Sequence, residues 1–200
     1  MQHESHSPSS PLANLFFSVD PTPELVIISG PSGSGKTNAC SGFSEHLRTL
    51  GVGQAGLISP PVIEDNQKIA IDLKAIHTGE KRQLAMLLAA PEHPTNEPAD
   101  SDLVFGKWRF DPDVLTWGNT VLSNLPSSEC FIIDELGPLE FRLGVGLQAG
   151  MSLLDNRTLN PAFVVVREEL LPAAVIRWPW SVILNLPQHD SQEPPGRELR

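Results

Sequence analysis

The eight residues GPSGSGKT, at positions 30–37, constrain the fold of this 200-residue chain more than any other stretch. They follow the apolar run LVIIS and precede apolar residues at helical spacing, which end at Gly51. The pattern G-x-x-x-x-G-K-[ST] is met in full, and it lies where it is expected to lie, between a strand and a helix. Such a loop turns its backbone N–H groups inward on a phosphate.

Each residue type in this loop has a physical reason. Gly30, Gly33 and Gly35 leave room where the chain comes closest to a phosphate, and Pro31 stiffens the turn. We expect Lys36 to reach the β- and γ-phosphates and the Thr37 hydroxyl to ligate Mg²⁺. The alternative is a Ser/Gly-rich loop that only happens to contain a lysine. The predicted nucleotide-binding residues are Gly30, Pro31, Ser32, Gly33, Ser34, Gly35, Lys36 and Thr37.

A second stretch, CFIIDE at 130–135, is typical of a buried strand that ends in acids. In a parallel sheet the carboxyl end of such a strand faces the same crevice as the phosphate loop. We expect Asp134 to hold Mg²⁺, directly or through a water, and Glu135 to orient and deprotonate an attacking water. Lys36 and Glu135 are the predicted catalytic residues. The alternative is that the acids merely end a strand at the surface.

The remaining pattern predicts one α/β domain of the P-loop NTPase class. Strand-like and helix-like runs alternate, which favours a three-layer sandwich, a mostly parallel sheet with helices on both faces. The acidic strand comes long after the strand at 54–59, which carries no acid, and this favours the class with an additional strand and a catalytic glutamate. We expect strands at 24–29, 54–59, 103–110, 130–135, 162–166 and 181–186, and helices from 36 and over 111–125, 145–156 and 168–177.

The segment 60–102 is predicted to be an insertion. It contains a β-hairpin around a His-Thr-Gly-Glu turn and an acidic, proline-rich loop at 90–102. We expect residues 1–22, rich in Ser, Pro and His, to lack fixed structure, residues 23–187 to form the domain, and residues 188–200 to be a polar tail.

Composition narrows the function classes. The net charge is −10, and only 14 residues are Lys or Arg, so nucleic acid is a disfavoured partner. No apolar run approaches the roughly 20 residues that span a bilayer, and no signal peptide is apparent. We therefore expect a cytoplasmic protein without a membrane segment, in which Cys40 and Cys130 are buried thiols. A protein partner or a homo-oligomer is left open.

The chain resembles the small P-loop nucleoside-triphosphatase family of the cancer-related nucleoside-triphosphatase type. The carrying residues are GPSGSGKT, GKWRF at 106–110 and IIDELGPLE at 132–140, within a resemblance over about residues 25–166. In that family an Asp-Glu pair is followed by a glycine and a further glutamate, here Gly137 and Glu140. The resemblance implies Mg²⁺-dependent hydrolysis of ATP, GTP and other nucleoside triphosphates with loose base selectivity. The segment 60–102 and the C-terminal tail match only loosely.

Two other functions stay open: a small-molecule kinase, for which an arginine-rich lid is expected and not apparent, and a nucleotide-dependent switch. Several side chains are weaker candidates. Glu140 would assist Mg²⁺ or water or form a structural salt bridge, and Arg167 would sense the γ-phosphate or be solvated. The tryptophans would stack on a base or, as we favour, pack on the sheet. The remaining candidates are the cations Lys81, Arg82, Arg109 and Arg142 and the aromatic residues Trp108, Trp117, Trp178 and Trp180.

Overall fold

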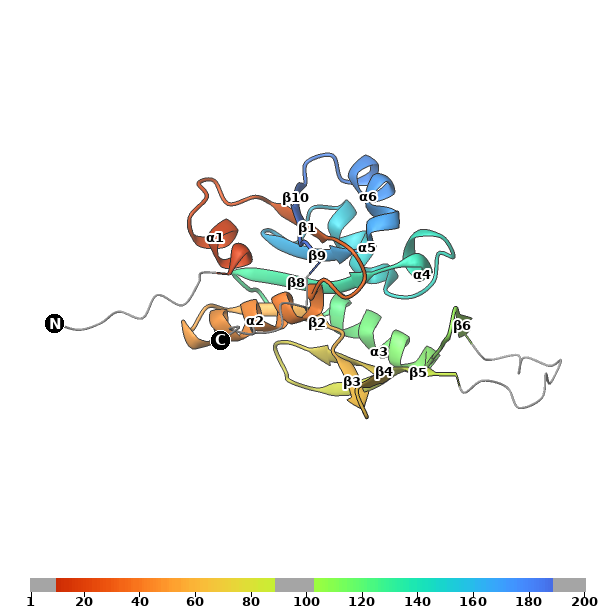
Figure 1. Ribbon diagram of the computed structural model, residues 1–200. Helices are drawn as coiled ribbons and strands as arrows, with labels where there is room; N and C mark the ends of the chain where they lie inside the picture. The colour runs from red at the N-terminus through yellow and green to blue at the C-terminus, as the bar shows by residue number, and fades with distance from the viewer. Residues whose placement is uncertain (1–9, 89–102, 189–200) are drawn as a thin grey trace, which may run out of the picture.

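The computed structural model describes residues 10–88 and 103–188 (Figure 1). The phosphate loop lies between strand β1 (Leu25–Ser29) and helix α2 (Lys36–Thr49), as expected. The acidic strand is β8 (Cys130–Leu136), and it is flanked in the sheet by β9 (Ala162–Val166) and β2 (Gln54–Ile58). The remaining edge of this part is β10 (Val182–Asn185).

In the described residues, ten strands form one mixed sheet, with the order β10-β1-β9-β8-β2-β4-β5-β7-β6 and with β3 on β4. The strands from β10 to β2 run parallel, whereas every pairing beyond β2 is antiparallel. Strand β9 lies between β1 and β8, so an additional strand separates the phosphate loop from the acidic strand. This arrangement confirms the predicted P-loop class.

Side-chain alternation explains the layers. Val26 and Ile28 of β1 point to one face, which is covered by α2 and by α1 (Pro11–Phe17). Leu25 and Ile27 point to the other face. That face is covered by α3 (Pro112–Ser123), α5 (Gln148–Asp155) and α6 (Leu171–Arg177). A parallel sheet needs such cover on both faces, and the predicted three-layer sandwich is confirmed.

The insertion contains a strand, β3 (Pro61–Glu64), in addition to the predicted hairpin. The predicted hairpin is present as β4 (Gln67–Ala75) and β5 (Lys81–Leu87). Strand β3 pairs with the first residues of β4, whereas β2 pairs with its last two. The single strand predicted at 103–110 is wrong: Gly106, with φ of +60°, opens a turn between β6 (Leu103–Phe105) and β7 (Trp108–Phe110). The predicted loop at 90–102 lies entirely outside the described residues.

The N-terminal prediction is wrong in part. Helix α1 lies inside the segment 1–22, which we expected to lack fixed structure, and Leu12 is fully buried against the sheet layer. Phe16 packs edge-on against Phe43 of α2, with ring centroids 5.9 Å apart. The Ser- and Pro-rich composition of the segment therefore led us to miss a short apolar helix within it. Residues 1–9 lie outside the described part.

Two predicted helices begin later than expected. The helix at 145–156 begins at Gln148, after the short helix α4 (Pro138–Phe141). The helix at 168–177 is a 3₁₀ turn, η1 (Glu168–Leu170), that continues into α6. Among the described residues, no helix has the length and apolar character needed to cross a membrane.

Candidate active site

The phosphate loop connects β1 to the first turn of α2. Gly35 is the N-cap residue of α2 with φ of +83°, a left-handed conformation that glycine adopts without strain. At Gly30 the constraint is steric, because an added Cβ would lie 2.3 Å from the carbonyl oxygen of Leu186, which follows β10. Glycine is therefore required at this position by the backbone that follows β10, and not only by the approach of a phosphate.

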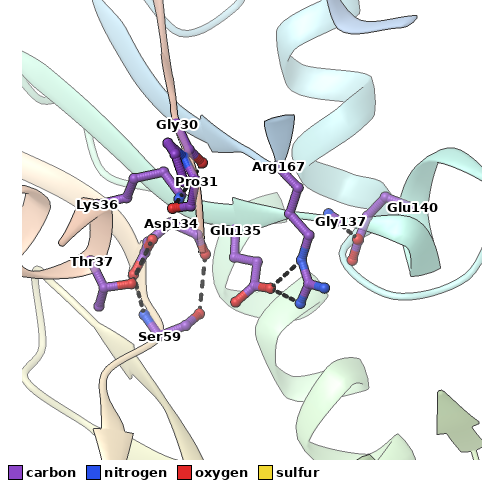
Figure 2. Close-up of polar contacts among 10 residues, drawn as sticks. All are labelled: Gly30, Pro31, Lys36, Thr37, Ser59, Asp134, Glu135, Gly137, Glu140 and Arg167. Atoms are coloured by element: carbon purple, nitrogen blue, oxygen red, sulfur yellow. Dashed lines mark hydrogen bonds and ion pairs between the residues drawn. The ribbon is translucent and has the colours of Figure 1, made fainter. Parts of the chain in front are cut away.

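Lys36 is folded back onto its own loop. Its Nζ donates to the carbonyl oxygens of Gly30 and Pro31, both at 2.7 Å (Figure 2). It also donates to Ser34 Oγ at 3.3 Å. Burial lowers the pKa of this ammonium below its usual value, although the Glu135 carboxylate opposes the shift. The group is half-buried and positioned by backbone oxygens.

Asp134 joins the phosphate loop to β8. Thr37 Oγ1 donates to Asp134 Oδ1 at 3.3 Å, and the Ser59 amide donates to Oδ2 at 3.1 Å. Ser59 Oγ also donates to the backbone oxygen of Asp134 at 3.1 Å. Burial raises the pKa of Asp134 to about 6, against the opposing hydrogen bond from Ser59. The hydroxyl and carboxylate oxygens of Thr37 and Asp134 suit a hard divalent cation.

Glu135 lies on an irregularity of the sheet. Its φ is +74°, which is uncommon for a residue with a side chain, and the β8–β9 register shifts between Ile133 and Leu136. A bulge of this kind redirects a side chain, and it is frequent next to active sites. Glu135 therefore follows Asp134 without continuing the usual alternation of the strand.

Arg167 follows β9 and pairs with Glu135. Its Nε donates to Glu135 Oε1 at 2.9 Å, and its Nη2 donates to the same oxygen (Figure 2). Burial disfavours the charged guanidinium, but the Glu135 carboxylate outweighs this effect and holds the pKa of Arg167 above its usual value. From the sequence we expected Arg167 either to sense the γ-phosphate or to be solvated. The structure shows a third role, an ion pair with the predicted base Glu135.

These side chains line one cleft of about 620 Å³. Lys36, Thr37, Asp134, Glu135 and Arg167 all face it, so the structure brings together the two sequence motifs. Of the predicted loop residues, Gly30, Ser32, Gly33 and Gly35 also line the cleft, whereas Ser34 is buried beneath and Pro31 is outside the lining. Asn38 lines it and was missed.

The opposite wall comes from two hairpins. Trp108 packs against the core, as we favoured from the sequence, and it also lines the cleft. The other wall residues were missed, because their position depends on antiparallel pairing rather than on a local pattern; the motif GKWRF was the one available signal. The missed wall residues are Pro61, Ile63, Lys68 and Lys107.

Glu140 has a structural role. Its Oε2 accepts the Gly137 amide and its Oε1 accepts the Leu147 amide, both at 2.7 Å. Burial raises the pKa of this carboxyl, while the two amides oppose the shift. Glu140 thereby fixes the chain that follows β8.

The other weak candidates do not line the cleft. Lys81 pairs with Asp72 and Arg82 with Glu80, while Trp178 is fully buried in the core. Arg82 and Arg157 lie over the rings of Trp117 and Trp180, respectively. Among the described residues, the structure does not bring Arg109 or Arg142 into the cleft lining.

Comparisons with known proteins agree with this geometry. The family described as NTPase matches residues 25–175. A nucleoside-triphosphatase THEP1 of Methanopyrus kandleri is 24% identical over 146 residues, which cover 73% of this chain and 74% of that protein.

Two solved structures share the fold. The solution structure of a human cancer-related nucleoside triphosphatase has a TM-score of 0.59 and 21% identity, covering 81% of this chain and 88% of its own. The crystal structure of THEP1 from Aquifex aeolicus has a TM-score of 0.58 and 15% identity, with 84% and 92% covered.

Proposed function

Since the chain belongs to the NTPase family, and is thus a nucleoside-triphosphatase, we propose that it hydrolyses the γ-phosphate of ATP, GTP and other nucleoside triphosphates with Mg²⁺. Loose selectivity for the base is part of the proposal and rests on the family resemblance. We also propose a cytoplasmic location, which two buried, unpaired cysteines support.

The observation that carries the proposal is the hydrogen bond from Thr37 to Asp134, which joins the phosphate loop to the acidic strand. It supports Thr37 and Asp134 as the Mg²⁺ ligands, the two protein oxygens leaving the remaining positions to phosphates and water. When bound, Mg²⁺ supplies positive charge that offsets the charge developing on the phosphate oxygens.

The chain's own groups perform the remaining steps. Lys36 exchanges the carbonyl oxygens of Gly30 and Pro31 for the β- and γ-phosphates, and the amides at the start of α2 face the same anion. Glu135 accepts a proton from water while the water oxygen forms a bond to the γ-phosphorus. The bond between that phosphorus and the bridging oxygen breaks, which yields a nucleoside diphosphate and phosphate.

Arg167 holds the base in place. Both of its hydrogen bonds end on Oε1 of Glu135, and among the described residues no hydrogen bond to Oε2 is present. Oε2 is therefore the oxygen that accepts the proton from water.

The direct test is phosphate release from each of the four ribonucleoside triphosphates by purified protein with Mg²⁺ and no added acceptor. We expect steady turnover of several triphosphates, and loss of productive binding in Lys36→Ala. Release only after a metabolite or a protein is added would support a kinase or a switch instead. Unchanged kinetics in Lys36→Ala would overturn the role of the phosphate loop.

A further inference from the structure

We propose that Lys68 is a catalytic residue that neutralises negative charge on the γ-phosphoryl group in the transition state, from within the same chain. The inference deepens the proposed function and rests on it. Neither sequence motif contains Lys68, and it belongs to the antiparallel extension rather than to the P-loop core.

The β3–β4 hairpin brings Lys68 to the cleft. This hairpin begins two residues after Ser59, whose amide contacts Asp134, so it extends from the carboxyl edge of the parallel strands. Its turn is formed by Asp65 and Asn66, with φ of +48° and +59°, and backbone pairing aligns Lys68 with Ile63. Ile63 and Lys68 both line the cleft opposite the phosphate loop.

An aromatic ring supports the ammonium without removing its charge. Lys68 Nζ lies 5.2 Å from the centroid of the Trp108 ring, and Lys107 Nζ lies 5.7 Å from it. A ring face attracts a cation through its quadrupole and brings no counter-charge. Trp108 thus orients Lys68 on the cleft wall and leaves its positive charge available.

The other two cations at the centre of the site are already engaged. Lys36 donates to backbone carbonyls, and Arg167 is paired with Glu135. Lys68 forms no ion pair with a carboxylate of the described residues. Burial lowers its pKa below the usual value, and the charges of Glu135, Arg167 and Asp134 act on it. Lys68 therefore lies within the field of the catalytic groups.

This position matches a need of the reaction. In phosphoryl transfer, negative charge spreads over the equatorial oxygens of the γ-phosphoryl group, and an added cation is worth a large factor in rate. Lys36 acts from the loop side, and Lys68 faces it from the hairpin wall. A chain with a net charge of −10 has particular need of such local cations.

The test compares Lys68→Ala with Lys74→Ala, an exposed lysine on the same strand that does not line the cleft. We expect Lys68→Ala to lower kcat by about 100-fold, the scale of one lost charge-stabilising donor. Affinity for a non-hydrolysable triphosphate, measured by calorimetry, should change little. Affinity for a nucleoside diphosphate with aluminium fluoride, which imitates the transition state, should fall by a similar factor as kcat. Lys68→Arg should retain part of both.

Three outcomes would overturn the inference. If Lys68→Ala behaves like Lys74→Ala while the wild type turns over, Lys68 has no catalytic role and the proposed function stands. If Lys68→Ala loses equal affinity for the non-hydrolysable triphosphate and for the diphosphate with aluminium fluoride, Lys68 serves ground-state binding only. If Lys68→Ala and Lys36→Ala regain activity when mixed, the cation acts on a second copy. No hydrolysis by the wild type would overturn the proposed function and this inference together.

Discussion

At the scale of single residues, the buried carboxyl of Asp134 lowers the stability of the protein when no nucleotide or metal is bound. This carboxyl is fully buried, receives two hydrogen bonds and has a pKa raised to about 6 from 3.8. The folded state therefore holds its proton more tightly than the unfolded chain does. Between these two pH values the unfolded state binds fewer protons, so stability falls as pH rises.

This argument predicts the effect of Asp134→Asn in protein free of nucleotide and metal. The neutral amide avoids the cost of a buried charge, so the variant should be more stable than the wild type at pH 7, by about 3 kcal/mol for a shift of this size. The difference should shrink as pH falls below 6 and level off below the unfolded pKa of 3.8, where the carboxyl is protonated in both states. Urea unfolding across this pH range in the presence of chelator measures it, and a pH-independent difference would contradict the burial argument.

At the scale of elements, Glu140 connects three segments: the end of β8, helix α4 and the start of α5. Its two carboxylate oxygens accept the amides of Gly137 and Leu147. Gly146 allows this approach, because a Cβ there would lie 2.1 Å from Glu140 Oε1. The motif thus contains Glu135, which we propose for the chemistry, and Glu140, which holds the chain that follows β8.

Glu140→Ala is therefore predicted to lower the free energy of unfolding by about 2–4 kcal/mol, because two buried amides lose their acceptors. Denaturant titration measures this loss, and Glu45→Ala, at an exposed residue of α2, is the control that should leave stability nearly unchanged. Full stability in Glu140→Ala together with a large loss of hydrolysis would contradict the structural role.

Helices and strands could be predicted where the sequence pattern that marks them is long and has clear ends. The strands β1, β8 and β9 are apolar runs that stop at clear boundaries, and α3 starts at Asp111, whose carboxylate accepts the amides of Asp113 and Val114. Helix α1 is too short to show a helical periodicity in the sequence. Its stability comes from packing on α2 and the sheet, which the local sequence does not show. The β6–β7 turn was missed because Gly106 also fits the interior of a strand.

At the scale of the whole molecule, the site is formed by the carboxyl edge of the parallel core and by hairpins of the antiparallel extension. The order of β1, β9 and β8 places the phosphate loop and the acidic strand at one cleft, and strand topology made this part predictable from sequence. The opposite wall could not be predicted. Lys68 and Trp108 meet through pairings between segments that are 40 residues apart, and no local pattern encodes them.

The central claim is that Glu135 is the base that acts on a nucleotide held by residues 30–37. Glu135→Gln, measured by pre-equilibrium triphosphate binding and by steady-state phosphate release, tests it most directly, with Glu64→Gln on β3 as the matched control. We expect the Glu135 variant to keep its affinity for the triphosphate and to lose about 10²–10⁴-fold in kcat, the scale of a general base. Normal turnover in Glu135→Gln would contradict the account.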